Sequence, residues 1–231
     1  MVIDLATTPT VTLNRRTAYR VVSAKFPPVD LFDDVASEQE FDAIFAIQAL
    51  TNPRLQNEAG NVNLISKDEI PSGIDGCTYA TAPFTHINPD GSRFSDGSYG
   101  VLYLADTIDT AIEESRFHQE KYFQNVSGMH YDSIIMRGLK FSFSATLVNI
   151  CNINNVDVYH PSDYTVSRSL GRQIKEAKLE GLQYNSVRHL SAICWALFTP
   201  KKVKRIIQTA HYEFIYDGAA ISHIRMISNI N

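Results

Sequence analysis

The stretch FTHINPDGSRFSDGSYGVLYLAD, residues 84–106, joins a turn-rich segment to a short apolar run. Glycine, serine, asparagine and aspartate fill its first part, and these residue types favour turns. The run GVLYLA, residues 100–105, predicts a buried strand. Asp106 or Thr107 follows and is suited to cap a helix that we expect to reach about Phe123. The stretch is therefore either a plain connection or one wall of a ligand site.

The composition is that of a folded protein. The chain has 231 residues, of which 44% are hydrophobic and 20% charged, and its formal net charge of -4 argues against nucleic acid as a direct partner. The 3 cysteines lack zinc-type spacing, so we expect reduced thiols and no metal site. The sequence shows neither a signal peptide nor an apolar run of membrane-spanning length, so we expect a cytoplasmic protein without membrane contact.

The pattern of hydrophobic residues on both sides of 84–106 predicts the fold class. We expect 1–16 to be a mobile N-terminal segment and 17–231 a single domain, with a loop-rich region over 53–100. Predicted helices cover 37–50, about 107–123 and 163–178, and predicted strands cover 17–24, 62–65, 78–82, 100–105, 132–137, 143–150, 181–184, 192–198, 203–209 and 212–217. Strands outnumber helices and do not alternate with them, which indicates an α+β fold with a mixed β-sheet core and flanking helices.

Common cofactor and hydrolase motifs do not occur, so the candidate site residues are dispersed polar residues beside strands. Arg20 lies in an apolar strand, where its guanidinium needs an anionic or carbonyl partner unless it faces solvent at a sheet edge. Small residues around Arg93 suit close approach to a phosphate, and the alternative is a solvated arginine paired to Asp90 or Asp96. Tyr103 points to the sheet face opposite its two leucine neighbours and is either a site residue or a core tyrosine.

Two further candidates lie on a predicted helix and after a predicted strand. Helical geometry places Glu114 and His118 at the edge of the inward stripe and turns Glu113 away, although an ordinary boundary glutamate is the alternative. Ser186 follows a short strand, with Arg188 close by, and its hydroxyl could bind a ligand or cap a helix. His86 is expected to be a structural residue that fixes the loop.

In combination and order, these residues resemble the RES domain family. The resemblance runs through YRVV, GSRFSDGSYGVLYLAD, TAIEESRFH and GLQYNSVR, while FPPVDLFDD, ALTNPRL and FTHINPDGSRF are similar to the longer bacterial members. It covers about residues 17–220, and residues 84–118 are its most specific part. The chain is longer than the minimal family toxin across 25–80, which leaves substrate access and the partner surface open.

The resemblance implies an ADP-ribosyltransferase-like fold and an enzyme that consumes NAD as its substrate, without a separate cofactor. Carried over by motif, the catalytic residues are Glu114, Arg20 and Ser186, and the NAD-binding residues are Arg20, Arg93, Tyr103 and Ser186. Family members are mostly bacterial toxins that cleave NAD with phosphate or water as acceptor, as NAD phosphorylases or glycohydrolases. Their partner is a protein antitoxin of the Xre/ParS type. The resemblance therefore allows either a homo-oligomer or a hetero-oligomer with the antitoxin.

The implied reaction agrees with these residue types. Breaking the nicotinamide–ribose bond develops positive charge on the ribose, which a carboxylate such as Glu114 stabilises. The first hypothesis is an NAD-degrading toxin, and the second is a protein ADP-ribosyltransferase that uses NAD. A third is a non-catalytic nucleotide-binding module, against which the intact set of polar residues argues.

Overall fold

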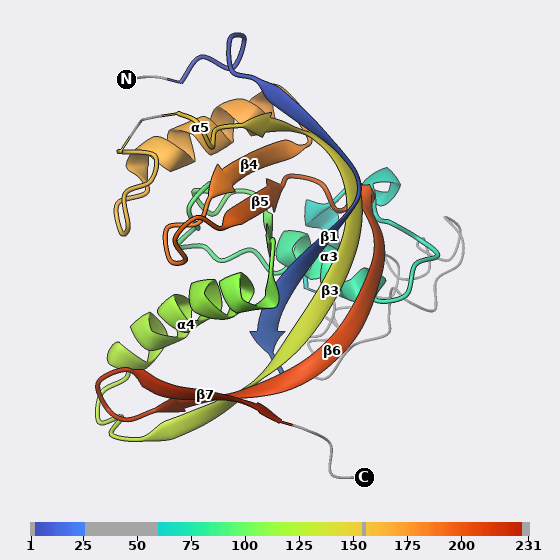
Figure 1. The fold of residues 1–231 in the computed structure, drawn as a ribbon. Helices are drawn as coiled ribbons and strands as arrows, with labels where there is room; N and C mark the ends of the chain where they lie inside the picture. The colour runs from blue at the N-terminus through green and yellow to red at the C-terminus, as the bar shows by residue number, and fades with distance from the viewer. Residues whose placement is uncertain (1–2, 26–59, 154–155, 228–231) are drawn as a thin grey trace.

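The computed structural model describes residues 3–25, 60–153 and 156–227, so the helix predicted at 37–50 lies outside the described residues. A 7-stranded mixed sheet forms its centre (Figure 1). The strands are β1 (Thr10–Ser23), β2 (Leu102–Ala105), β3 (Asp132–Asn149), β4 (Gly181–Asn185), β5 (Ile193–Leu197), β6 (Val203–Tyr216) and β7 (Ile221–Ile227). Their order is β1-β2-β5-β4-β3-β6-β7, and β1 also pairs with β3. The strands from β1 to β3 in this order therefore close into a ring of pairings.

β3 organises the sheet because both of its edges are used. β1 runs antiparallel along one edge over the whole length from Thr10 to Ser23. β6 pairs antiparallel with the other edge over 132–143, and β4 pairs parallel with β3 beyond it, at Val148 and Asn149. β3 therefore belongs both to the closed ring and to the β6–β7 extension.

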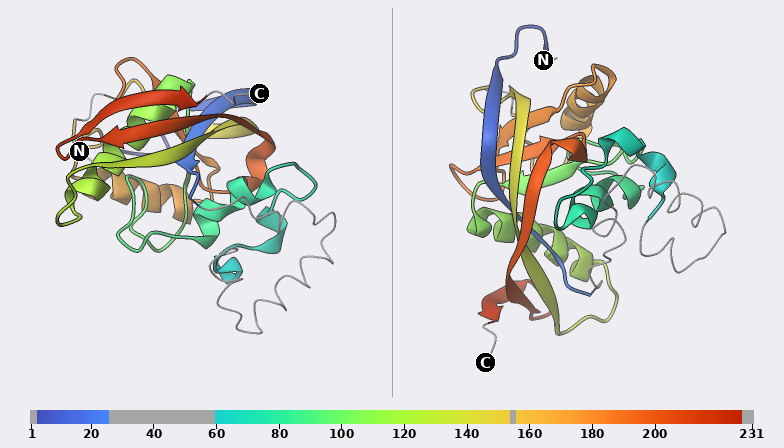
Figure 2. Two further views of the ribbon diagram at one scale, coloured as in Figure 1. Left: turned by 90° about the horizontal axis from the view of Figure 1, so that it is seen from below. Right: turned by 90° about the vertical axis from the view of Figure 1, so that its right-hand side faces the viewer.

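Helices cover the sheet on more than one side. They are α3 (Cys77–Thr85), α4 (Ile108–Gln124) and α5 (Thr165–Glu176), with the short 3-10 helices η2 (Val62–Leu64), η3 (Lys67–Glu69) and η4 (Pro200–Lys202). In Figure 1, α4 and α5 lie on the same side of the long curved strands, with β4 and β5 between them. Figure 2 shows η2, η3 and α3 gathered at the end of the molecule away from β7. These elements confirm the α+β class with a mixed sheet.

α4 forms as its sequence predicts. Thr107 is the N-cap, and its side chain accepts a hydrogen bond from the N–H of Thr110. Ala111 is buried on the inward stripe, and Ser115 Oγ donates to the carbonyl of Val21 at 3.3 Å. The stripe therefore packs α4 against β1.

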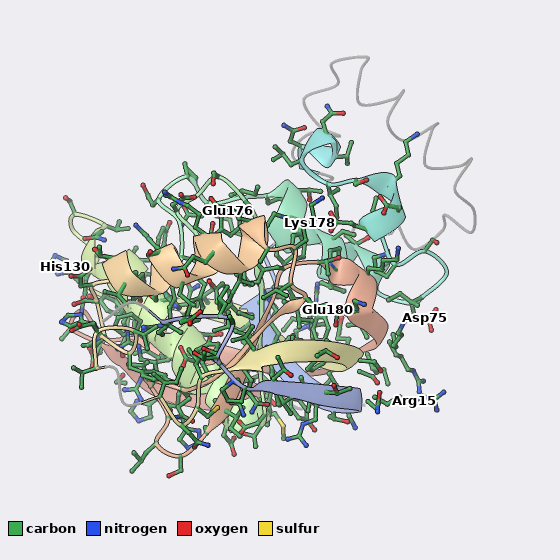
Figure 3. All side chains as sticks on the ribbon, turned by 90° about the horizontal axis from the view of Figure 1, so that it is seen from above. Arg15, Asp75, His130, Glu176, Lys178 and Glu180 are labelled. Atoms are coloured by element: carbon green, nitrogen blue, oxygen red, sulfur yellow. The ribbon has the colours of Figure 1, made fainter. Side chains whose placement is uncertain are left out.

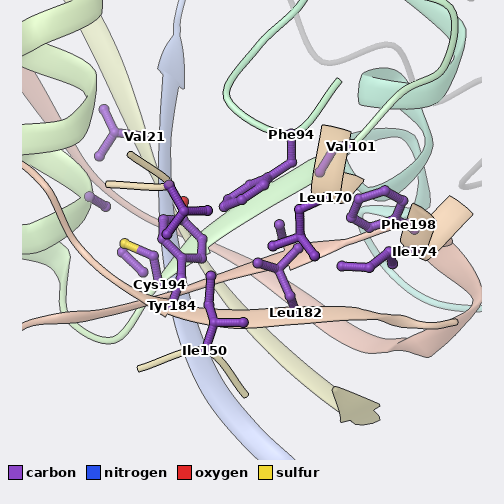
Figure 4. Packing of buried hydrophobic residues seen from close by; sticks show 14 of the residues in the cluster. Val21, Phe94, Val101, Ile150, Leu170, Ile174, Leu182, Tyr184, Cys194 and Phe198 are labelled. Carbon is purple, nitrogen blue, oxygen red and sulfur yellow. The ribbon is translucent and has the colours of Figure 1, made fainter. Parts of the chain in front are cut away.

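Two buried clusters lie on the two faces of the sheet. Leu102 and Leu104 belong to one of them, whereas Tyr103 packs against the other, so the alternation predicted for β2 is confirmed. The second cluster contains Phe94 from the loop before β2 and Tyr184 from β4 (Figure 4). The loop is thus part of the core and not only a surface connection.

An ion pair and a hydrogen bond of Glu180 connect segments that are far apart in the sequence. Figure 3 shows Glu180 beside η4, where Lys202 Nζ lies 2.5 Å from Glu180 Oε1. The other carboxylate oxygen of Glu180 accepts the N–H of Thr146 on β3 at 2.6 Å. The two contacts of Glu180 fix the chain between α5 and β4, and so they fix the position at which β4 begins.

The strands predicted at 62–65 and 78–82 are wrong. Residues 62–64 form η2, and 78–82 lie inside α3. In α3 the hydroxyl of Thr81 bonds back to the carbonyl of Cys77 at 3.1 Å. Buried Cys77, Ala80, Thr81 and Phe84 follow helical spacing, which outweighs the strand preference of the threonines.

Strand lengths also differ from the prediction. The two strands predicted at 132–137 and 143–150 are one continuous strand, β3. Gly138 in its middle lets β6 approach closely, because a Cβ there would lie 2.6 Å from Thr209 Oγ1. The two strands predicted at 203–209 and 212–217 are likewise one strand, β6. Residues 10–16, assigned to a mobile segment, belong to β1, and β7 was not predicted. Polar residues obscure the strand pattern over 10–16, and the partner of this segment, β3, is far away in sequence.

Gly171 of α5 gives a test of how closely α5 packs on the loop before β2. A Cβ at this position would lie 2.0 Å from the carbonyl oxygen of Phe94. We expect Gly171→Ala to lower the free energy of unfolding by roughly 1–3 kcal/mol, despite the better helix propensity of alanine. Urea denaturation followed by circular dichroism measures this. Ser169→Ala, at an exposed position of the same helix, is the control and should not destabilise; equal behaviour of the two variants would contradict the close packing.

Candidate functional site

A hydrogen bond between α4 and the end of β4 is the centre of the candidate site. Ser186 Oγ donates to Glu114 Oε1 at 2.6 Å. The same Oγ accepts the backbone N–H groups of Arg188 at 3.1 Å and His189 at 2.9 Å. Ser186 therefore caps the turn after β4 and at the same time orients the Glu114 carboxylate.

Buried side chains of β4 and β5 surround this carboxylate. Cys194 Sγ lies 3.9 Å from Glu114 Oε1, the distance of a weak thiol hydrogen bond. Burial, with a smaller contribution from the charge of Glu114, raises the pKa of the Cys194 thiol, so the thiol stays protonated and acts as the donor. Figure 4 shows Cys194 next to Tyr184. Both hydrogen bonds involve Oε1, and none from the described residues reaches Glu114 Oε2.

Tyr103 holds the turn-rich loop onto β2. Its hydroxyl accepts the N–H of Phe94 at 2.9 Å and shares a hydrogen bond with Ser92 Oγ at 2.8 Å. Desolvation raises the pKa of Tyr103 to about 12, so the phenol is neutral at physiological pH. The hydroxyl is thus occupied by the loop, and the ring remains for contact with other groups.

Arg93 reaches across to the segment before α5. Its Nη1 donates to the carbonyl oxygens of Val158 at 3.4 Å and His160 at 3.0 Å. Its guanidinium carbon lies 4.6 Å from the ring centroid of Tyr164. The alternative of a pairing with a loop aspartate does not occur, because Asp96 instead pairs with Arg172 of α5 at 2.7 Å. Arg93 is therefore anchored on neutral groups, which do not cancel its charge.

The loop that presents Arg93 is fastened to α5. Arg168 Nε donates to the carbonyl of Ser92 at 3.0 Å, and its Nη2 donates to the carbonyl of Asp90 at 2.7 Å. Together with the close approach of Gly171 to Phe94, these bonds fix the loop on both sides of Arg93. Sequence reasoning did not single out Arg168, because its partners are backbone atoms more than seventy residues away.

Arg20 has the carbonyl partner that an arginine in an apolar strand needs. Its Nη1 donates to the backbone oxygen of Tyr103 at 3.2 Å. Desolvation lowers the pKa of Arg20 to about 10, although the side chain keeps some contact with solvent, and the guanidinium is charged at neutral pH. No hydrogen bond or ion pair among the described residues joins Arg20 to Glu114. Arg20 is thus linked to the site through β2.

His118 follows Glu114 by one helical turn. Desolvation is the main cause that lowers the pKa of His118; the charges of Arg188 and Arg93 act in the same direction, and Glu114 opposes them. The side chain nevertheless keeps an exposed surface. With Lys121, which also lowers the pKa, His118 lies within electrostatic range of four charged groups that come from three different segments.

Tyr184 connects the candidates, and sequence reasoning missed it. Burial raises the pKa of this tyrosine well above its usual value, and the groups that contribute to the shift include Glu114, Tyr103 and Arg93. Ser186 joins the same group through its bond to Glu114. The ring of Tyr184 also packs edge-on against Phe94 of the loop, with ring centroids 5.0 Å apart. No local pattern marks Tyr184, because its neighbours come from α4, β2 and the loop.

Residues 70–217 match the family model described as the RES domain. The chain belongs to the RES domain family. The uncharacterized protein y4oC of Sinorhizobium fredii is 31% identical over 206 residues, which cover 88% of this chain and 84% of that protein. The family membership predicted from YRVV through GLQYNSVR is therefore confirmed.

Among solved structures, the RES domain of this chain is similar to a chain in the crystal structure of the M. tuberculosis MbcT–MbcA toxin–antitoxin complex. The match has a TM-score of 0.45 and 10% identity, and it covers 89% of each chain. This likeness is too weak to assign residues or activity. Family membership therefore follows from the sequence matches alone.

The matched range of the RES domain includes Arg93, Tyr103, Glu114 and Ser186, and Arg20 lies before it. The described residues contain no group of three or more His, Cys, Asp or Glu side chains that could hold a metal ion. Of the helices in the described part, none is long and apolar enough to cross a membrane. The site of this RES domain is thus built from one carboxylate, hydroxyl groups and arginines.

Tyr103→Phe tests the loop anchor of the RES domain. The substitution removes the acceptor of the Phe94 N–H, and we expect the free energy of unfolding to fall by about 1–3 kcal/mol. Urea denaturation measures the change. Tyr122→Phe, at a tyrosine that is 62% exposed on α4, is the matched control and should leave stability unchanged. A Tyr103→Phe protein as stable as wild type would show that the hydroxyl does not hold the loop.

Proposed function

We propose that this RES domain is an enzyme that cleaves NAD between nicotinamide and ribose and passes the ADP-ribosyl group to phosphate or water. The observation that carries the proposal is the Glu114 carboxylate, which Ser186 fixes through Oε1 while Oε2 accepts no hydrogen bond from the described residues. Membership of the RES domain family supports an action on NAD. We further propose that the protein is a cytoplasmic toxin, that NAD is a substrate rather than a bound cofactor, and that the partner is an antitoxin of the Xre/ParS type.

Glu114 supplies the electrostatic part of the reaction. When the C1–N bond of the nicotinamide riboside breaks, its electron pair leaves with nicotinamide, which becomes neutral, and positive charge spreads over the ribose ring. A carboxylate held in place before the bond breaks stabilises this charge without reorganising. Oε2 of Glu114 is the oxygen that would face the ribose, because Oε1 is taken by Ser186.

Ser186 acts on the reaction through Glu114. Its hydroxyl donates a hydrogen bond to the carboxylate, and its oxygen accepts hydrogen bonds from two backbone N–H groups. The single O–H of Ser186 is already bonded to Glu114. Ser186 could therefore donate a hydrogen bond to NAD only if that bond broke. The hydrogen bonds therefore favour a positioning role for Ser186, and its contact with NAD stays a prediction.

The arginines supply the charge for the pyrophosphate of NAD. Arg20 and Arg93 are held by backbone carbonyl oxygens and form no ion pair with a carboxylate among the described residues. Each keeps its full charge and N–H groups that can bind phosphate oxygens in pairs. Tyr103, whose hydroxyl is occupied by the loop, offers its ring face to the nicotinamide.

Glu114→Gln tests the proposed reaction. Amide replaces carboxylate without a large change of shape, so we expect nicotinamide release from NAD by the purified protein to fall about 100-fold or more, while folding is preserved. Chromatography of the products measures the release. Glu113→Gln is the matched control, because Glu113 is turned toward Arg116, at 3.8 Å, and should keep wild-type activity. Equal rates for Glu114→Gln and wild type would remove Glu114 from the mechanism.

The same assay distinguishes the acceptor. NAD labelled in its adenylate part is incubated with the protein, with or without phosphate and cell lysate. Soluble ADP-ribose or its phosphate ester as the product supports NAD degradation. Label that accumulates on a lysate protein in proportion to the nicotinamide released would instead establish a protein ADP-ribosyltransferase. Wild-type protein that releases no nicotinamide under any of these conditions would overturn the proposed function.

A further inference from the structure

Arg188 is a charged residue at the candidate site to which no role has been assigned so far. It lies in the turn after β4, two residues beyond Ser186, and its backbone N–H donates to Ser186 Oγ at 3.1 Å. That hydroxyl in turn donates to Glu114. The backbone of Arg188 is therefore part of the same hydrogen-bonded unit as the carboxylate.

The guanidinium of Arg188 is positioned without being neutralised. Its central carbon lies 3.3 Å from the ring centroid of Phe117, three residues after Glu114 on α4, and its Nη2 donates to the carbonyl oxygen of Pro161. Within the described ranges, Arg188 forms no ion pair with a carboxylate. The side chain is only half-buried. Its remaining N–H groups are available to an anion.

Arg188 and Arg93 converge on one segment, residues 160–161. Arg93 donates to the carbonyl of His160 and Arg188 to the carbonyl of Pro161, the next residue. Desolvation is the main cause that lowers the pKa of His118, and the charges of both arginines act in the same direction. Two like charges held near each other repel, and an anion bound between them removes this repulsion.

We propose that Arg188 binds the phosphate that accepts the ADP-ribosyl group, and that it thereby favours phosphate over water as the acceptor. The inference rests on the proposed function. The backbone N–H of Arg188 belongs to the Ser186–Glu114 unit, and the proposed function places the C1 atom of the ribose at that carboxylate. The pyrophosphate of NAD is separated from C1 by the ribose ring. The guanidinium of Arg188, held over Phe117 on the same helix as Glu114, therefore suits the acceptor better than the pyrophosphate.

The transfer step balances without a further reactant. An anionic oxygen of hydrogen phosphate forms a bond to C1 of the ribose while the bond from C1 to the nicotinamide nitrogen breaks. The electron pair of that bond stays on nicotinamide, which leaves as a neutral molecule, and ADP-ribose 1-phosphate is formed. Water in place of phosphate must also lose a proton. Arg188 contributes by holding the phosphate oxygens in place for this attack.

The test compares Arg188→Gln and Arg188→Lys with wild type in nicotinamide release at increasing phosphate. For Arg188→Gln we expect the KM for phosphate to rise about tenfold or more, with more ADP-ribose relative to its phosphate ester, because charged hydrogen bonds are lost. We expect the KM for NAD to change less than about twofold. Arg188→Lys, which keeps the charge but loses paired hydrogen bonds, should fall between the two. Arg205→Gln, at an exposed position on β6, is the matched control.

Several results would overturn the assignment. A raised KM for NAD with an unchanged KM for phosphate would place Arg188 at the pyrophosphate instead. Nicotinamide release by wild type that does not depend on phosphate would also refute the assignment of Arg188. The proposed cleavage of NAD would still be supported by that result. Phosphate binding to each protein in the absence of NAD, measured by calorimetry, gives a second readout independent of turnover. Wild type without any nicotinamide release is a different result, which overturns the proposed function itself.

Discussion

The use of both edges of β3 is the constraint on which the rest of the structure depends. β1 takes one edge, and β6 and β4 divide the other between them. With β4 held at the end of β3, the turn at Ser186 is delivered to the side of the sheet on which α4 packs. With β1 on the opposite edge, Arg20 is brought next to β2. The hydrogen bond between Ser186 and Glu114 is therefore a consequence of strand pairing far from the site.

The electrostatics of the site follow from how its arginines are anchored. Arg20, Arg93 and Arg188 all donate to backbone carbonyl oxygens, and two of them also lie over aromatic rings. Such partners fix the direction of a guanidinium but do not cancel its charge. Arg172, by contrast, is paired with Asp96 and serves to hold the loop. The two kinds of arginine differ in their partners.

Features that depend on local patterns could be predicted from the sequence. The capped helix α4, the buried strand β2 and the position of Glu114 at the edge of the inward stripe follow from capping and periodicity over a few residues. α3 was misjudged because threonines favour strands, although its buried residues have helical spacing. The contacts of Tyr184 and the carbonyl partners of Arg93 could not be predicted, since they arise from segments that only the folded sheet brings together.

The position of β1 also bears on what constitutes a folding unit in this chain. The family match begins at residue 70 and ends at 217, so it leaves out β1 and β7. A fragment cut at those limits would expose one edge of β3 along most of its length and would open the ring between β3 and β2. Long unpaired edges of this kind recruit other chains, so such a fragment would aggregate rather than fold. The segment by which the family is recognised is thus shorter than the segment that can exist alone.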